Sequence, residues 1–296
     1  MTGFELSLVL TAALLHAGWN IAAKKARHGG EGGQGEQLNF QLLCGLAVVL
    51  LWAPVGLTVS VQELPRWGAL QWAAVSLSAL VHMAYFSALL NGYARADLTV
   101  VYPVARGSGP LLASLGAVLL LGERPQWQGW VGIGGIVLGV LLISGLLRRK
   151  PMTPAVAAGL RWGALTGALI ASYTVIDAWA IKRLGMHPVA FDYWCNLLRV
   201  PMLLPLWWQL SSRAALGRSW QLDRGAVLVV GAFAPLGYIL VLWALKTAPL
   251  SAVAPVRECS MLFAALIGGH LLGEGDRWAR LLGAGFIALG VLLIAA

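Results

Sequence analysis

The sequence is poor in charged residues. Asp, Glu, Lys and Arg together make up 11% of its 296 residues, against about 25% in a typical soluble protein. Hydrophobic residues make up 59% of the chain, and the mean hydropathy is +0.76. A soluble protein of this composition could not cover its surface with polar groups, whereas a lipid bilayer removes that need. The composition therefore indicates an integral membrane protein.

Cysteine is also scarce, and the motifs of common enzymes are missing. The three cysteines, Cys44, Cys195 and Cys259, fall within apolar segments, so we expect buried free thiols and no disulfide. The sequence has no HExxH, GxSxG or Walker motif and no dinucleotide-binding motif. We therefore expect a protein that is not an enzyme, with no catalytic residues, no cofactor and no metal site.

Ten apolar segments are of a length that suits a membrane-spanning helix, which needs about 20 residues. The predicted spans are residues 4–24, 38–59, 68–91, 98–121, 127–147, 159–181, 189–210, 225–245, 250–272 and 277–295. The polar segment 148–158 lies near the middle of the chain and is predicted to be a linker. The predicted organisation is a first half over residues 1–147 and a second half over residues 159–296.

The two halves repeat each other. Residues 132–145 read GIGGIVLGVLLISG and residues 283–296 read GAGFIALGVLLIAA, so that nine of fourteen positions are identical at an offset of 151. The same offset pairs Trp127 with Trp278 and Arg106 with Arg257. Each half holds five predicted spans, an odd number, so the second half must cross the membrane in the opposite direction. Inverted repeats of this kind are common in transporters, with the binding site near the membrane midplane.

Short motifs in the first and fourth spans are typical of a known family. They are His16-Ala17-Gly18-Trp19-Asn20 with Lys24-Lys25, and Leu121-Gly122-Glu123-Arg124. Over nearly its whole length the chain resembles the drug/metabolite transporter superfamily, in particular its EamA-like branch. The resemblance implies an all-α integral membrane fold, with ten transmembrane helices in two inverted five-helix repeats and a central cavity lined by spans 1–4 and 6–9. It also implies a multi-pass transport protein of a bacterial-type inner membrane, and most such relatives are exporters.

Most Lys and Arg residues lie at the ends of the apolar segments. The net charge of +9 is therefore better explained by loops that meet anionic lipid than by binding to nucleic acid. These residues are concentrated after the odd-numbered spans, which by the positive-inside rule places both termini outside the cytoplasm. Relatives of known structure have cytoplasmic termini instead, so the two indications of orientation disagree.

Two arginines within the spans mark a candidate substrate site. A charge at membrane depth costs about 2.5–3.5 kcal/mol even on the milder insertion scale. Arg106 shares a helix face with Tyr102, and the repeat places Arg257 at the equivalent position. Two guanidinium groups that face one cavity would bind carboxylate or phosphate oxygens. The alternative is a structural ion pair, and Glu258 could neutralise part of the charge of its neighbour Arg257.

Other polar side chains in the spans are predicted to contribute to the same site. His16 shares a face with Trp19 and Asn20, and Asp177 lies one helical turn after Tyr173. The predicted substrate-binding residues are Arg106, Arg257, Tyr102, Trp19, Asn20, Tyr85, Tyr173, Asp177 and Asn196. The candidates for proton coupling are His16, His82, Asp177 and Glu258. Each could instead be a hydrogen-bonded packing residue, whereas Glu123 and Glu274 are predicted to make structural contacts at helix ends.

The sequence predicts a secondary-active transporter for a small zwitterionic or anionic metabolite, such as an amino acid or an aminophosphonate. It would work by alternating access about a cavity between the repeats, with export as the expected direction. The predicted partners are this small molecule and the lipid bilayer, with proton coupling as a candidate and either a monomer or a homodimer as the assembly. The alternatives are a flippase for a lipid-linked substrate, and an intramembrane enzyme or assembly subunit.

Overall fold

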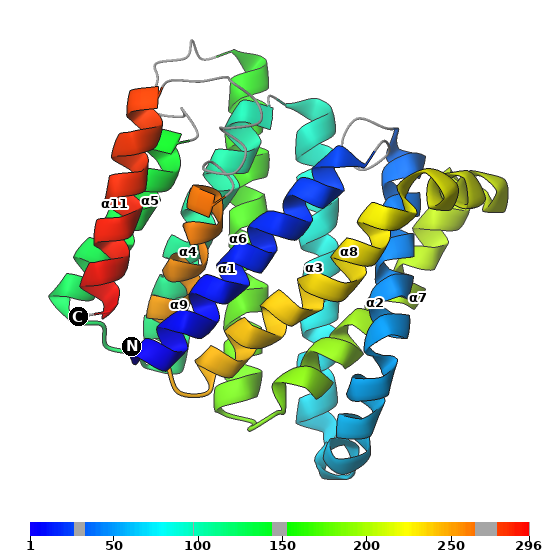
Figure 1. Ribbon diagram of the computed structural model, residues 1–296, viewed down its shortest axis with the longest axis horizontal. Coiled ribbons are helices and arrows are strands. Elements are labelled where there is room, and N and C mark those ends of the chain that lie inside the picture. Colours follow the sequence, from blue (N-terminus) through cyan, green and yellow to red (C-terminus); the bar gives the residue numbers. More distant parts are fainter. Residues whose placement is uncertain (27–32, 97, 144–152, 264–276, 296) are drawn as a thin grey trace.

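The structure is built from helices. The computed structural model describes residues 1–26, 33–96, 98–143, 153–263 and 277–295 (Figure 1). Within these ranges there is no strand, and the helical elements are α1 (Gly3–Lys25), α2 (Gln34–Glu63), η1 (Leu64–Arg66), α3 (Ala69–Arg95), α4 (Leu98–Leu121), α5 (Trp127–Ile143), α6 (Pro154–Lys182), α7 (Pro188–Leu210), α8 (Arg213–Leu245), α9 (Leu250–Arg257) and α11 (Arg277–Ala295). The predicted all-α membrane fold is confirmed, and every predicted span contains helical residues.

Six of these helices are long and apolar enough to cross a membrane, namely α1, α2, α3, α4, α6 and α8, while α5 and residues 281–295 of α11 are apolar but shorter. Large apolar side chains are exposed on the outside of the bundle. Leu119 is 78% exposed and Val61 is 75% exposed. An apolar outer surface of this kind suits lipid and not water. The protein is therefore a multi-pass membrane protein.

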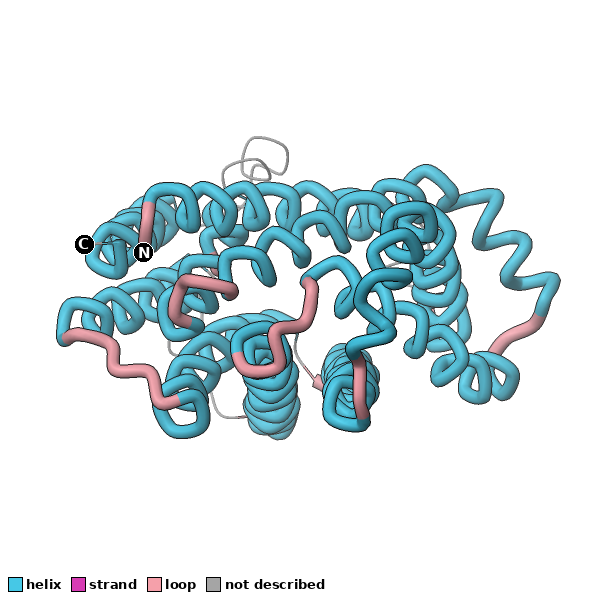
Figure 2. Tube along the Cα trace, turned by 90° about the horizontal axis from the view of Figure 1, so that it is seen from below, coloured by secondary structure: helices cyan, strands magenta, loops and turns pink. Residues whose placement is uncertain are grey.

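The two halves run in opposite directions and exchange their first helices. Helix α1 begins at the end of the molecule where α6 finishes (Figure 1). Helix α1 packs on α8 of the second half, whereas α6 packs on α3 and α4 of the first half, and α2 packs on α7. Viewed from below, the helices form a flattened array with both termini at one side (Figure 2). The core of the protein is therefore shared between the repeats.

Helices α5 and α11 pack against each other through glycines. A Cβ atom at Gly132 would lie 2.7 Å from the carbonyl oxygen of Gly290, and one at Gly283 would lie 2.7 Å from the carbonyl oxygen of Gly139. Only hydrogen at these positions allows the two backbones to approach so closely. The repeated glycine-rich strings thus form the contact between the last helices of the two repeats.

Two helices begin five or more residues before their predicted spans. Helix α8 begins at Arg213 and not at residue 225, because Ser212 caps it and Leu216 packs against the cluster of α2 and α7. At 33 residues it is about 50 Å long, more than the roughly 30 Å of hydrocarbon. Helix α6 begins at Pro154, so the end of the predicted linker is helical. The three cysteines are free and buried, as predicted.

Candidate functional site

The polar residues of the predicted spans gather where the two repeats meet. Arg106 on α4 donates to the carboxylate of Glu258, just after α9, with a closest nitrogen–oxygen distance of 3.4 Å. Its guanidinium also lies 2.8 Å from Nε2 of His16 on α1 and above the ring of Tyr102. Glu258 is 1% exposed. The ion pair therefore joins the first repeat to the second inside the bundle.

Helix α9 ends at this ion pair. Pro255 has no N–H to donate to the carbonyl of Ser251, and Ser114 on α4 donates to that carbonyl instead, over 3.4 Å. After Arg257 the α-helix ends in a tighter turn, in which the N–H of Glu258 donates to the carbonyl of Pro255, three residues earlier. A helix that is interrupted beside buried charges is typical of transporter binding sites. The predicted continuous span 250–272 is therefore interrupted at Glu258, and residues 264–272 lie outside the described part.

Arg257 differs from its repeat mate. It is 9% exposed, yet its guanidinium forms no hydrogen bond or ion pair with any residue in the described ranges. It lies within electrostatic reach of Tyr173, Glu258 and Tyr238, and also of Arg106. Glu258 acts electrostatically on Arg257, as expected, but its direct ion pair is with Arg106. Arg257 is thus a buried cation with unused donors.

Asp177 on α6 forms the centre of a second group. Its side chain is fully buried. Oδ1 accepts a hydrogen bond of 2.5 Å from the hydroxyl of Ser78 on α3, and Oδ2 accepts one from the hydroxyl of Tyr238 on α8. Tyr238 also lies within electrostatic reach of Arg257, which connects this group to the arginines.

Aromatic rings surround this group. The ring of His82 stacks on that of Tyr173, with centroids 3.8 Å apart and planes at 25°. The rings of Tyr85 and Tyr173 meet in an edge-type arrangement, with their centroids 5.7 Å apart. Nδ1 of His82 lies 2.9 Å from the carbonyl oxygen of Ser78 and 3.3 Å from its hydroxyl. The structure therefore brings His82, Tyr85 and Tyr173 together beside Asp177.

The remaining predicted residues lie at the edges of the cluster. Asn196 on α7 donates to the carboxylate of Asp192 at 3.0 Å and accepts from Arg199 at 2.5 Å, so it is bound within its own helix. Asn20 donates to the backbone carbonyl of His16 at 2.7 Å. The rings of Trp19 and His16 meet in an edge-type arrangement, with their centroids 4.7 Å apart. Roles in substrate binding or proton coupling stay predictions for all of these residues.

Glu123 makes the helix-end contact predicted from the sequence. Its two oxygens accept from the N–H groups of Leu250 and Ser251 at 2.7 and 2.9 Å, which caps the start of α9. Lys182 lies 3.9 Å from the same carboxylate and donates to the carbonyl of Ala248. The equivalent Glu274 lies outside the described residues.

Two members of the cluster were missed by the sequence reasoning. Neither Ser78 nor Tyr238 is among the site residues predicted from the sequence. Both directly contact Asp177. The spacing of Ser78, His82 and Tyr85 on one helix face was the available signal. Among the described residues, no group of three His, Cys, Asp or Glu side chains is placed to hold a metal ion.

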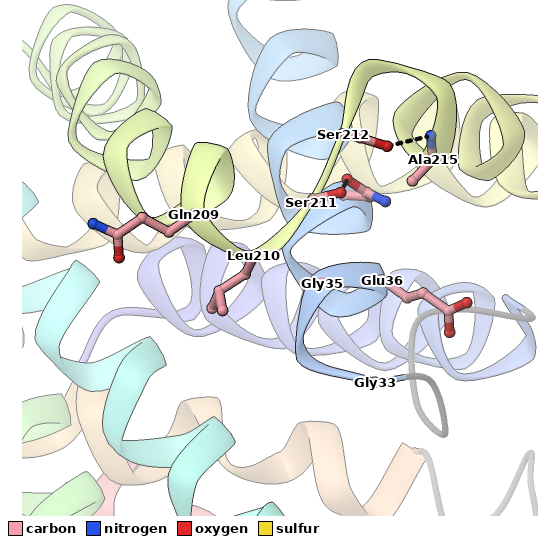
Figure 3. Close-up of a pocket in the computed structure, with 9 residues that line it drawn as sticks. Gly33, Gly35, Glu36, Gln209, Leu210, Ser211, Ser212 and Ala215 are labelled. Atoms are coloured by element: carbon pink, nitrogen blue, oxygen red, sulfur yellow. Dashed lines mark hydrogen bonds between the residues drawn. The ribbon is translucent and has the colours of Figure 1, made fainter.

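Two pockets lie at the ends of the bundle, away from the cluster. One of about 530 Å³ lies between the start of α2 and the α7–α8 turn and is lined by residues such as Glu36, Gln209 and Ser212 (Figure 3). Asn39 in its wall is buried, and its carbonyl oxygen accepts from Trp207 at 2.7 Å. The second, of about 350 Å³, adjoins Glu123. Neither pocket includes Arg106, Arg257 or Asp177, so the candidate site is defined by its buried charges.

A bundle of two inverted helical repeats, with buried charges at their junction, defines the class of multi-pass membrane transport proteins. The model of the EamA-like transporter family matches the chain twice, over residues 3–145 and 157–296. The chain belongs to the EamA-like transporter family, and it is a membrane transporter. The two matches fall on the two predicted halves of the chain.

Individual proteins agree with this assignment. The chain is 26% identical over 261 residues to the "Uncharacterized transporter YwfM" of Bacillus subtilis (strain 168), which covers 87% of this chain and 82% of that protein. A crystal structure of a protein with 16% identity superposes with a TM-score of 0.73, over 99% of this chain and 96% of the other. This second similarity shows a shared fold.

Proposed function

We propose that this protein is a secondary-active transporter that exports a small zwitterionic or anionic metabolite, such as an amino acid or an aminophosphonate, across the cell membrane. Arg257 carries this proposal, because it is a buried cation without a hydrogen-bond acceptor among the described residues. A carboxylate or phosphonate group would supply the acceptor, and guanidinium binds such groups through two parallel hydrogen bonds.

The neighbouring ion pair supplies a mechanism for coupling binding to movement. Arg106 belongs to the first repeat and Glu258 to the second, and alternating access requires the repeats to move against each other. An anionic group between Arg106 and Arg257 would compete with Glu258 for Arg106. Substrate binding would then weaken a contact that holds the repeats together.

The proposal is tested by ligand binding to the purified protein in detergent. Thermal unfolding is measured with a panel of amino acids, dicarboxylates and aminophosphonates, since a ligand that binds the folded state raises its apparent stability. Arg257→Gln should weaken the binding of every hit by about 10–100-fold, the loss expected for hydrogen bonds to a charged group. Arg213→Gln, an exposed arginine at the start of α8, is the matched control and should bind as the wild type does.

Transport itself is tested in proteoliposomes. The wild-type protein should exchange labelled hits across the bilayer, and Arg257→Gln should not do so at the same concentration. Equal binding by the wild type and Arg257→Gln would refute the anion site. Movement of lipid-linked substrates alone would favour the flippase, and chemical conversion of such a substrate without movement would favour the intramembrane enzyme.

A further inference from the structure

Asp177 is a buried carboxylate without a positive partner. Its side chain is fully buried, and no Lys, Arg or His nitrogen of the described residues forms an ion pair with it. Its oxygens accept hydrogen bonds from Ser78 and Tyr238, which are both neutral. A buried charge that is held only by neutral donors is unfavourable compared with the protonated form of the same group. The surroundings of Asp177 therefore suit a carboxyl that gains and loses a proton.

The other buried carboxylates of the cluster are held differently. Glu258 lies 3.4 Å from the guanidinium of Arg106. Asp192 accepts from the amide of Asn196, which in turn accepts from Arg199. Each of these two carboxylates therefore reaches a cation, either directly or through one amide. Of the three, Asp177 alone has no Lys or Arg within one hydrogen-bonded side chain among the described residues, and both its oxygens accept from neutral hydroxyls.

The hydrogen-bond network around Asp177 can accommodate both protonation states. The ionised carboxylate accepts from Ser78 and Tyr238, as observed. Once protonated, the carboxyl must donate one hydrogen bond, and the Ser78 hydroxyl can accept it. Ser78 can then turn its own hydrogen towards Nδ1 of His82, which lies 3.3 Å away. Both states keep a partner for each Asp177 oxygen and for the Ser78 hydroxyl, and the protonated state requires the His82 tautomer whose Nδ1 accepts.

The internal repeat provides a neutral counterpart. Asn20 occupies in α1 the position that Asp177 occupies in α6, at an offset of 157 residues. Its amide bonds to the backbone of its own helix and cannot titrate. At this position the two repeats therefore differ chemically: the second repeat has a titratable side chain, Asp177, and the first repeat does not.

We propose that Asp177 is the proton-binding site of this transporter, and that it exchanges one proton with water while Asn20 exchanges none. In this step one O–H bond of a hydronium ion breaks as one O–H bond forms on the Asp177 carboxylate, a water molecule is released, and no other covalent bond changes. The titratable and charged side chains around it come from four other helices: His82 on α3, Asp192, Cys195 and Arg199 on α7, Tyr238 on α8 and Arg257 on α9. The role of this proton in transport rests on the proposed function, but proton binding itself can be measured without a substrate.

Infrared spectroscopy of the purified protein tests the assignment. The carbonyl stretch of a protonated carboxyl is followed during a pH titration in H2O and in D2O, across the pH range in which the protein stays folded. The wild type should show a titrating band, and Asp177→Asn, which copies the residue of the first repeat, should lack it. Asp192→Asn is the matched control, because it removes the neighbouring buried carboxyl of α7 and leaves the hydrogen bonds of Asp177 in place, and it should keep the titrating band. Loss of the band in Asp192→Asn instead of Asp177→Asn would overturn the assignment.

Two further variants keep the test decisive if Asp177→Asn folds poorly. Tyr238→Phe removes one donor to the ionised form, so the band should persist to higher pH. Asn20→Asp should add a second titrating band. A wild-type spectrum without a titrating band, or a band that survives Asp177→Asn, would overturn the proposal. Because no substrate is present, these results are independent of whether the protein exchanges amino acids or aminophosphonates in liposomes.

Discussion

The buried ion pair between Arg106 and Glu258 makes a quantitative prediction. Glu258→Gln keeps the shape of the side chain but removes its charge, so Arg106 loses its ion pair and keeps its contact with His16. Removing one partner of a buried pair costs about 3–5 kcal/mol of unfolding free energy. Arg106 keeps its contact with His16, and 14% of its side chain is exposed. We therefore expect a loss near the lower end, about 3 kcal/mol.

A double-mutant cycle isolates this pair. The combined Arg106→Gln and Glu258→Gln variant should be more stable than the sum of the single losses predicts, with a coupling energy of about 1–3 kcal/mol. Unfolding by SDS in mixed micelles, followed by tryptophan fluorescence, measures each variant. Glu63→Gln is the control, because its pair with Arg66 is exposed and should contribute about 0–0.5 kcal/mol. A coupling energy of zero, or equal losses in Glu258→Gln and Glu63→Gln, would refute the reasoning.

Three further predictions concern packing, a buried amide and pH. Gly139→Leu should lower the unfolding free energy by about 1–3 kcal/mol because its side chain meets α11, whereas Gly134→Leu, which faces open space, should be neutral in the same SDS titration. Asn39→Leu should cost about 1–3 kcal/mol because a buried indole N–H loses its acceptor. Gln41→Leu should be tolerated in a thermal unfolding assay, since the Gln41 carbonyl oxygen has no partner among the described residues. Burial lowers the pKa of His187, which lies outside the predicted spans, from 6.5. The unfolded chain then binds the proton more readily, so stability should be complete above pH 6.5 and fall below it, and His187→Asn should weaken this dependence in unfolding titrations at several pH values.

The sequence predicts the architecture well because apolar length and an internal repeat are local properties of the chain. Both features can be recognised without knowing which helices are in contact. The start of α8 could not be read in this way. Residues 213–224 are polar enough to resemble a loop, and they become helical because Ser212 caps them and Leu216 packs on the neighbouring helices.

The pairing of the buried charges could be predicted only in part. Spacing along one helix shows which residues share a face, so His82 with Tyr85 on α3, and Tyr173 with Asp177 on α6, could be paired from the sequence. Contacts between repeats depend on how each helix is rotated and where it ends. Glu258 follows Arg257 in the sequence but pairs with Arg106. Ser78 carries no signal of its own, because a serine in a membrane helix usually bonds to its own backbone.

The ion pair between the repeats also sets an order of events during synthesis. Its two residues are 152 positions apart. At about 5–20 residues per second, Glu258 leaves the ribosome about 8–30 s after Arg106. During that interval an arginine destined for the protein interior must remain in the membrane or at its surface without its carboxylate. The first repeat is therefore inserted before it can fold completely. Arg106 must remain accessible until the second repeat is inserted and Glu258 can pair with it.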